Sequence, residues 1–413
     1  MGLSSEAPEL PVDLVTEQIL TRLPGKSLMR FKCVSRHWLS VISSKHFTDR
    51  FLTVRPSPRL FMCLWDPNDD NRNRYWVTLS LAPSSTSSSS TTTPSSFVVD
   101  QDLTIPGMGG YNLQNFRGFM CYSNGSIALI YNPATAELVT LPFFRSCIRG
   151  KKVASYYFGH DPVNDQYKVV SLVSARKQFR GLVTVTSENW VFDLKTGKGC
   201  CSWKKAALTP PDFSHQQIGL GGGVCIDGVI YYLAWTPYKK VVVSFDIRSE
   251  EFNMIPVPYD ENVRNMALLE HGGKVTLFDQ TNLKDMGVVA LWTLEEARSK
   301  KWSCKSRVLE SSQMHLVNSI AFKIRGTTQK GKVLLKPEEF LSPFHILCYD
   351  IQSNDMSKIE MEGIPNSWFS LDKGPAFDLV FMDQSESVME WETLIHGEMI
   401  DAAAPSTGSK DQL

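Results

Sequence analysis

The side chains most able to perform chemistry are thinly spread along this chain of 413 residues. None of its eight histidines has metal-site spacing to a cysteine or to a second histidine. Cys200 and Cys201 are adjacent, unlike the spaced pairs of zinc and redox motifs, so buried or turn cysteines are favoured over a redox-active pair. We therefore predict no metal ion, no cofactor and no catalytic residue.

Two other motifs look reactive but have simpler explanations. GLGGG at 219–223 is as rich in glycine as a phosphate-binding loop, but a strand pattern follows it instead of a helix. We predict a turn or bulge that needs positive φ there. His160 and Asp161 lie in FGHDPVNDQY, whose Asp, Pro and Asn residues form turns, so a turn is favoured over a catalytic pair. GxSxG and HExxH motifs are absent.

Bulk composition is that of an ordinary folded protein, with 42% hydrophobic and 21% charged residues. Lys+Arg and Asp+Glu both number 43, which favours neither a nucleic acid nor a membrane partner. The sequence has no apolar run long enough to span a membrane and no secretory signal. Its nine cysteines lack framework spacing, which predicts reduced thiols in the cytoplasm, the nucleus or both.

The elements that position any binding residues change type along the chain. Apolar residues recur at helical spacing over residues 9–52, with Asp13, Ser27 and Ser35 as expected N-caps and Pro24 ending the first helix. Helices this short are marginal alone, so packing must stabilise them. Residues 24–52 hold six basic residues against one acidic residue, which fits either an acidic partner or a solvated basic face.

Beyond residue 60 the pattern is that of strands, with a loose internal repeat. Each repeat joins two apolar runs by a short polar turn, and an Asx side chain there can close the turn. Four repeats carry such a residue directly after an aromatic one: Asn132, Asp193, Asp246 and Asp350. Hairpin repeats of about 50 residues are typical of a β-propeller. We predict about six blades, with seven possible, and a closing strand in AFDLVFM at 376.

The predicted β domain covers residues 60–392 and contains a Ser/Thr-rich insert at 82–96. A tolerated loop is favoured there over a phosphorylation site. Residues 1–8 and 400–413 are predicted to be disordered. Five tryptophans at strand positions are expected to pack between blades, with a recognition face as the alternative for any one of them. They are Trp190, Trp203, Trp235, Trp292 and Trp302.

Residues 9–52 resemble an F-box through an ordered set of short matches. They are Leu10-Pro11, Asp13-Leu14, Ile19-Leu20, Arg22-Leu23-Pro24, Lys26-Ser27-Leu28, Arg30-Phe31-Lys32, Cys33-Val34-Ser35, and Trp38 followed by Ile42 and Phe47. The rest resembles the F-box-associated, kelch-like propeller region of plant F-box proteins, through pieces such as GFMCYSNGSIALIYNPATAELVTLP and VVSFDIRSEEFNMIPVP. The predicted fold class is therefore α+β multidomain, a short N-terminal helical F-box followed by an all-β propeller.

The resemblance implies a non-catalytic substrate receptor of an SCF-type cullin-RING ubiquitin ligase. In this family the F-box binds a Skp-type adaptor, and through it cullin and a RING subunit, while the propeller holds the protein substrate. Such a receptor acts by proximity alone. The alternatives are an adaptor-bound or free interaction scaffold outside a ligase, and a propeller hydrolase, for which we identify no convergent carboxylate or histidine cluster. Neither a nucleic acid nor a membrane partner is predicted.

Large apolar side chains on short helices typically insert into a groove of a partner. The predicted adaptor-binding or contact-supporting residues are Leu10, Pro11, Leu14, Ile19, Leu20, Leu23, Pro24, Leu28, Val34 and Trp38. For Trp38, packing between the helices is the favoured role. The alternative for the whole set is a purely local core against the β domain.

Overall fold

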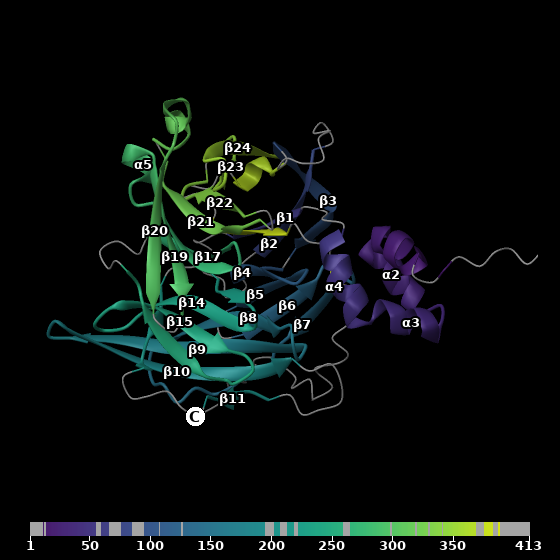
Figure 1. Cartoon of the computed structure of the whole chain (residues 1–413), viewed down its shortest axis with the longest axis horizontal. Coiled ribbons are helices and arrows are strands. Elements are labelled where there is room, and N and C mark those ends of the chain that lie inside the picture. The colour runs from purple at the N-terminus through teal and green to yellow at the C-terminus, as the bar shows by residue number, and fades with distance from the viewer. Residues whose placement is uncertain are drawn as a thin grey trace, which may run out of the picture.

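The computed structural model of the protein shows a helical N-terminal part beside a larger body of strands (Figure 1). It describes residues 11, 14–54, 59–65, 76–84, 95–106, 108–124, 127–194, 202–206, 213–218, 222–258, 265–297, 300–318, 320–328, 331–340, 342–368, 376–382 and 387–388. The predictions for residues 1–8, the tail 400–413, Leu10 and Asp13, and most of the insert at 82–96, lie outside these residues.

Residues 14–54, which we call the helical unit, consist of short helices. They are the π-helical turn η1 (Val15–Ile19), the 3-10 turn η2 (Leu20–Arg22), α2 (Gly25–Lys32), α3 (Arg36–Ile42) and α4 (Lys45–Val54). The side chains that pack together at its centre are Leu20, Leu28, Ile42, Phe47 and Phe51, joined by Val388 from the far end of the chain. This shared core stabilises helices that are too short to persist alone.

Two of the predicted helix caps are tested within the described residues. Ser35 is confirmed, because its Oγ accepts a hydrogen bond from the amide of Trp38 at 3.2 Å. The prediction of Ser27 as an N-cap is wrong, because α2 begins at Gly25 with Pro24 in the N-cap position. Pro24 ends the preceding turn in an extended conformation and needs no amide partner, so the next helix starts directly after it.

The strands form six units with four strand positions each, which we take as the blades of a propeller; in the fourth unit, β12 and β13 share the position beside β14. The first unit holds β1 (Arg59–Trp65), β2 (Trp76–Pro83) and β3 (Ser96–Pro106). The second holds β4 (Tyr111–Phe116), β5 (Phe119–Asn124), β6 (Ile127–Asn132) and β7 (Glu137–Thr140). The third holds β8 (Val153–Asp161), β9 (Gln166–Phe179), β10 (Leu182–Leu194) and β11 (Lys204–Lys205).

The remaining blades follow in chain order. The fourth holds β12 (Gln216–Gln217), β13 (Val224–Ile226), β14 (Val229–Trp235), β15 (Lys240–Asp246) and β16 (Phe252–Pro256). The fifth holds β17 (Met266–His271), β18 (Lys274–Asp279), α5 (Leu283–Met286), β19 (Val288–Glu296) and β20 (Lys301–Val308). The sixth holds β21 (Phe322–Thr327), β22 (Lys332–Pro337), β23 (His345–Asp350) and β24 (Asp355–Glu362). Two 3-10 turns, η5 (Ser311–Leu316) and η6 (Asn366–Trp368), complete the elements.

The chain closes the ring with its last described strand, β25 (Ala376–Met382). β25 pairs antiparallel with β1, with Asp378 opposite Cys63, and so completes the first blade. The prediction of a closing strand at this position is confirmed. On the other edge of that blade, β3 pairs in parallel with β24 of the sixth blade. The two ends of the propeller thus share one eight-stranded sheet.

The predicted Asx turns are confirmed at three blades. Asn132 Oδ1 accepts a hydrogen bond from the amide of Ala134 at 3.0 Å, and Asp246 and Asp350 accept from the residue two positions on at 2.8 and 2.9 Å. Each turn joins the last two strands of its blade. The turn after Asp193 lies outside the described residues. The internal repeat in the sequence is therefore the outer half of a blade.

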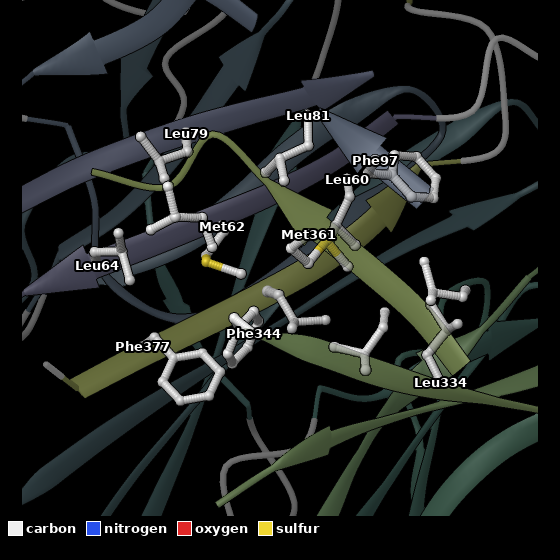
Figure 2. Packing of buried hydrophobic residues seen from close by; sticks show 14 of the residues in the cluster. Leu60, Met62, Leu64, Leu79, Leu81, Phe97, Leu334, Phe344, Met361 and Phe377 are labelled. Atoms are coloured by element: carbon white, nitrogen blue, oxygen red, sulfur yellow. The ribbon is translucent and has the colours of Figure 1, made fainter. Parts of the chain in front are cut away.

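Apolar side chains pack between adjacent blades. Figure 2 shows the cluster where the first and sixth blades meet, with Leu60 and Phe97 facing Leu334 and Met361. The predicted packing role is confirmed for Trp302, which packs, partly buried, against the cluster of the fourth and fifth blades and donates from Nε1 to the Pro256 carbonyl at 3.0 Å. Each large apolar side chain buried in this way contributes about 1.5–3 kcal/mol.

The glycine-rich segment at 219–223 is described only for its last two residues. Neither Gly222 nor Gly223 has positive φ, so that prediction is wrong for them. A Cβ at Gly222 would lie 2.7 Å from the side chain of Gln114, and one at Gly223 would lie 2.8 Å from the Tyr231 carbonyl. Close packing against Gln114 of the second blade and against the backbone of β14, rather than a left-handed backbone, therefore requires these glycines.

The two ends of the ring present different turns. The face that contacts the helical unit, here the proximal face, carries the turns between first and second strands, including Arg117–Gly118 and Pro162–Asp165. The distal face carries the turns between second and third strands, including Arg180–Gly181 and Thr236–Lys239. Antiparallel strands separate these two sets of turns by the full length of a blade.

Candidate partner-binding site

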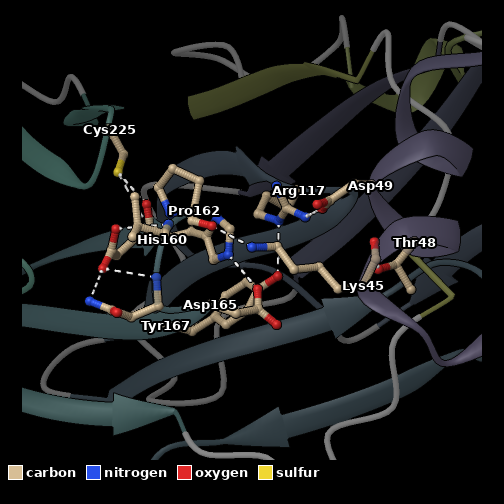
Figure 3. A network of polar contacts seen from close by, with 12 residues as sticks. Lys45, Thr48, Asp49, Arg117, His160, Pro162, Asp165, Tyr167 and Cys225 are labelled. Carbon is tan, nitrogen blue, oxygen red and sulfur yellow. Dashed lines mark hydrogen bonds and ion pairs between the residues drawn. The ribbon is translucent and has the colours of Figure 1, made fainter.

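Helix α4 attaches the helical unit to the proximal face and lies between the propeller and the other helices (Figure 1). Lys45 Nζ donates a hydrogen bond to the carbonyl of Pro162, and Asp49 forms an ion pair with Arg117. Arg117 also donates from Nε to the Tyr167 hydroxyl at 3.0 Å (Figure 3). Two adjacent propeller turns thereby hold α4 through two of its side chains with opposite charge, Lys45 and Asp49.

A second attachment comes from the far end of the chain. Lys32 is buried, and its ammonium donates to the carbonyl of Val388 at 2.6 Å. The preceding residue, Ser387, donates from its amide to the Gly118 carbonyl at 3.3 Å. A buried ammonium needs such a partner, because its desolvation would otherwise be costly. Residues 387–388 therefore link the helical unit to the propeller.

These contacts account for part of the basic character of residues 24–52. Lys32 and Lys45 bond to main-chain carbonyls, and Arg50 lies 3.4 Å from Glu17 within the helical unit. Lys26, Arg30 and Arg36 are exposed. For these residues, an acidic partner surface and a solvated basic face both remain predictions.

His160 and Asp161 serve the turn that receives Lys45. The Asp161 carboxylate accepts hydrogen bonds from the amide of Val163 at 3.1 Å and from Arg248 at 2.8 Å. The Arg248 guanidinium in particular holds the pKa of Asp161 well below its usual range. His160 Nε2 lies 2.7 Å from an Asp165 oxygen, and burial lowers the pKa of its imidazole. The predicted turn is confirmed, and both side chains are occupied in maintaining it.

The predicted adaptor-binding residues divide into exposed and buried groups. Leu14, Ile19 and Val34 are 45%, 41% and 69% exposed, and the described prolines Pro11 and Pro24 are also exposed. Leu20 and Leu28 are buried in the core of the helical unit, and Leu23 and Trp38 are partly buried against it. Leu10 lies outside the described residues.

Two exposed apolar residues were not predicted. Phe31 and Leu39 are 36% and 43% exposed, and the Phe31 ring meets the edge of Trp38 at 6.5 Å between centroids. Their side chains leave the helical unit from α2 and α3, whereas Phe47, Phe51 and Leu52 of α4 are buried. The apolar side chains of α4 are therefore buried, whereas α2 and α3 expose apolar side chains to solvent. Exposed apolar groups of this kind are typical of an interaction site.

A cavity of about 2080 Å³ runs through the ring and is lined by both polar and apolar side chains. Thr53 of α4 borders it at the proximal end, and Arg176 and Lys240 border it at the distal end. Glu270, which also lines it, has a pKa raised by burial and by nearby Asp227. Within the described part of the chain, no group of three or more His, Cys, Asp or Glu side chains is arranged to hold a metal ion.

A small helical unit fixed to a six-bladed propeller, with apolar side chains exposed, defines a class of two-part interaction proteins. Comparison with known families matches residues 8–50 to the F-box domain and residues 59–385 to the F-box associated beta propeller domain. The chain belongs to the plant F-box proteins that carry this propeller.

Relatives match along most of the chain. An F-box/LRR-repeat protein of Arabidopsis thaliana is 45% identical over 392 residues, covering 91% of this chain and 86% of that protein. An F-box protein of the same plant is 43% identical, covering 93% and 94%, and an F-box/kelch-repeat protein is 38% identical, covering 87% and 86%. No helix among the described residues has the length and apolarity needed to cross a membrane.

Proposed function

We propose that this protein is the substrate-recognition subunit of an SCF-type cullin-RING ubiquitin ligase. Its F-box docks on a Skp-type adaptor, which links it to cullin and the RING subunit, and its propeller holds the protein substrate. The observation that best supports this proposal is the exposure of Leu14, Ile19 and Val34 on an F-box whose fourth helix is fixed to the propeller. A complex of this kind acts in the cytoplasm, the nucleus or both.

The exposed residues are the proposed direct contacts with the adaptor. They are Pro11, Leu14, Ile19, Pro24 and Val34, to which we add Phe31 and Leu39. Leu20, Leu23, Leu28 and Trp38 support these contacts from within the F-box, and Leu10 extends the set at its N-terminal end. Burial of each large apolar side chain contributes about 1.5–3 kcal/mol, which can offset the loss of freedom on association.

The chain itself performs no covalent chemistry in this proposal. It raises the effective concentration of substrate lysines near the ubiquitin that the RING-bound enzyme carries. The contacts of α4 with Arg117 and Pro162 fix the direction in which the propeller extends from the adaptor. A substrate on the propeller would therefore be presented from a defined side.

The proposal is tested by recovering partners from plant extract with the tagged full chain. The variant L14A/I19A/V34A should lose both the Skp-type adaptor and cullin, because it removes exposed apolar contacts. The control V153A/M286A/V308A truncates three exposed apolar side chains of the propeller, 53%, 62% and 60% exposed, and should recover both partners. Recovery of adaptor without cullin by the wild type would favour a scaffold outside a ligase. Absence of adaptor with the wild type would contradict the proposal.

A further inference from the structure

Two neighbouring hairpins on the distal face combine basic and aromatic side chains. We call this group the distal patch. It consists of Arg176, Lys177, Phe179 and Arg180 on the β9–β10 hairpin, and Trp235, Tyr238, Lys239 and Lys240 on the β14–β15 hairpin. The β9–β10 hairpin projects from the ring on the side away from the F-box helices (Figure 1).

Direct contacts join the two hairpins into one surface. The Arg176 guanidinium lies 5.0 Å from the centroid of the Trp235 ring, and Trp235 is opposite Lys240 in the β14–β15 register. Arg176, Trp235 and Lys240 also line the distal end of the central cavity. The Arg180 guanidinium lies 5.2 Å from the ring of Phe179. The patch therefore borders the mouth of the cavity.

Two of the three aromatic side chains of the patch are largely open to solvent, whereas Trp235 is partly buried. Phe179 is 71% exposed and Tyr238 is 89% exposed. The last four residues of β9 are exposed, whereas the residues before them are buried between blades. This end of the hairpin extends past the packed part of the ring. Phe179 therefore does not contribute to the packing of the blade. Exposed rings beside guanidinium groups are typical of interaction surfaces.

Charge in the patch has one sign. Residues 174–187 of the β9–β10 hairpin and residues 232–245 of the β14–β15 hairpin hold five Lys and Arg residues and no Asp or Glu. Among the described residues, no carboxylate pairs with Arg176, Lys177 or Arg180. A surface of this kind attracts a negatively charged partner and speeds its association.

We propose that the distal patch binds an Asp- and Glu-rich segment of the substrate protein. This inference rests on the proposed function of the propeller as a substrate holder. The guanidinium groups of Arg176 and Arg180 and the ammonium of Lys177 pair with the carboxylates. The rings of Phe179 and Tyr238 cover apolar parts of the segment. Gln216 and Asn265 line the adjoining cavity, and their amides carry both a donor and an acceptor suited to a peptide backbone.

A peptide fits these observations better than a nucleic acid. The basic residues are confined to two adjoining hairpin ends, whereas a nucleic acid needs cations that follow its backbone over several phosphates. The chain as a whole has equal numbers of acidic and basic residues, 43 each, so no wider positive field surrounds the patch.

The test measures binding of a short fluorescent Asp/Glu-rich peptide to the full chain by anisotropy. R176Q/K177Q/R180Q should bind the peptide about tenfold more weakly, because three exposed charge contacts are lost. The control K301Q/K305Q/R307Q removes the same charge from exposed positions on β20 of another blade and should bind like the wild type. Raising the salt concentration should weaken wild-type binding more than binding by R176Q/K177Q/R180Q.

A second variant and further probes keep the proposal open to contradiction. F179A/Y238A should also weaken binding but should leave the salt dependence intact. Equal affinity of the wild type and R176Q/K177Q/R180Q for the peptide would overturn the proposal. So would tighter binding of a single-stranded DNA oligonucleotide than of the peptide at the same patch. Adaptor recovery by R176Q/K177Q/R180Q, which should equal that of the wild type, tests the F-box function separately.

Discussion

The proximal face and the distal patch of the propeller are both built from hairpin turns but treat their charges differently. On the proximal face, Arg117 pairs with Asp49, Arg248 with Asp161, and Lys168 with Glu250 at 2.5 Å. On the distal face, Arg176 and Arg180 lie beside aromatic rings instead of carboxylates. Paired charges hold one conformation, whereas cations beside open rings remain available to a partner. The difference separates a face used for attachment from a face suited to recognition.

The largest expected effect concerns the F-box that the proximal face supports. Leu28→Ala should lower the free energy of unfolding of the helical unit by about 2–5 kcal/mol, because Leu28 is fully buried there. Val34→Ala, at an exposed position, should change it by less than about 0.5 kcal/mol. Native-state hydrogen exchange of the α2 amides measures both. Equal loss of protection in the two variants would contradict the division into supporting and contact residues.

A buried cation at the ring closure gives the next largest effect. Lys336 donates to the Phe377 carbonyl at 2.5 Å, and burial lowers the pKa of its ammonium from 10.5 to about 7. Because the folded pKa is below the unfolded pKa, the folded state binds fewer protons between these values, and stability rises with pH across this window. Between pH 6 and pH 9 the gain is about 2.7 kcal/mol.

The measurement for Lys336 is chemical unfolding of the wild type and Lys336→Met at both pH values. The wild type should gain stability relative to the variant as pH rises. Lys358→Met, at a partly exposed position on β24, is the control and should show no such difference. A constant difference between the wild type and Lys336→Met would show that the lysine is not neutralised in the folded state.

A smaller effect is expected at the attachment of α4 to the proximal face. Removing Asp49, Arg117 or both should give a coupling energy of about 0.5–1 kcal/mol in a double-mutant cycle, because the pair is only partly shielded from solvent. The readout is the stability of α4 by hydrogen exchange. A cycle of Lys274 and Glu295, an exposed pair on the fifth blade, should leave α4 unchanged. A coupling energy of zero between Asp49 and Arg117 would contradict the proposal that this pair fixes the orientation of the propeller relative to the F-box.

The smallest effect is expected at the distal patch. Arg176→Gln should change the free energy of unfolding by less than about 0.5 kcal/mol, because the side chain is exposed and makes no ion pair with a described carboxylate. Thermal unfolding measures this change. A destabilisation comparable to that of Leu28→Ala would mean that the patch is structural, and the contrast between the two faces would fail.

Features that depend on neighbouring residues were predictable from the sequence. Ser35 caps α3, and the Asx residues Asn132, Asp246 and Asp350 close their turns, because each bond joins groups two or three positions apart. Strand patterning in AFDLVFM likewise marked the closing strand. The prediction failed where two helix-start signals lay close together. Pro24 occupies the N-cap position that was expected for Ser27.

Features that join distant segments were decided only by the tertiary structure. Lys32 lies 356 positions from its partner Val388, and nothing in either local sequence signals the bond. The contact of Arg176 with Trp235 exists because blades three and four are adjacent in the ring. Local sequence determines turns and strand patterns through short-range hydrogen bonds and periodic burial. Ring closure and blade packing decide which charged side chains form ion pairs and which remain accessible to a partner. Both arise from many weak contacts across the whole chain.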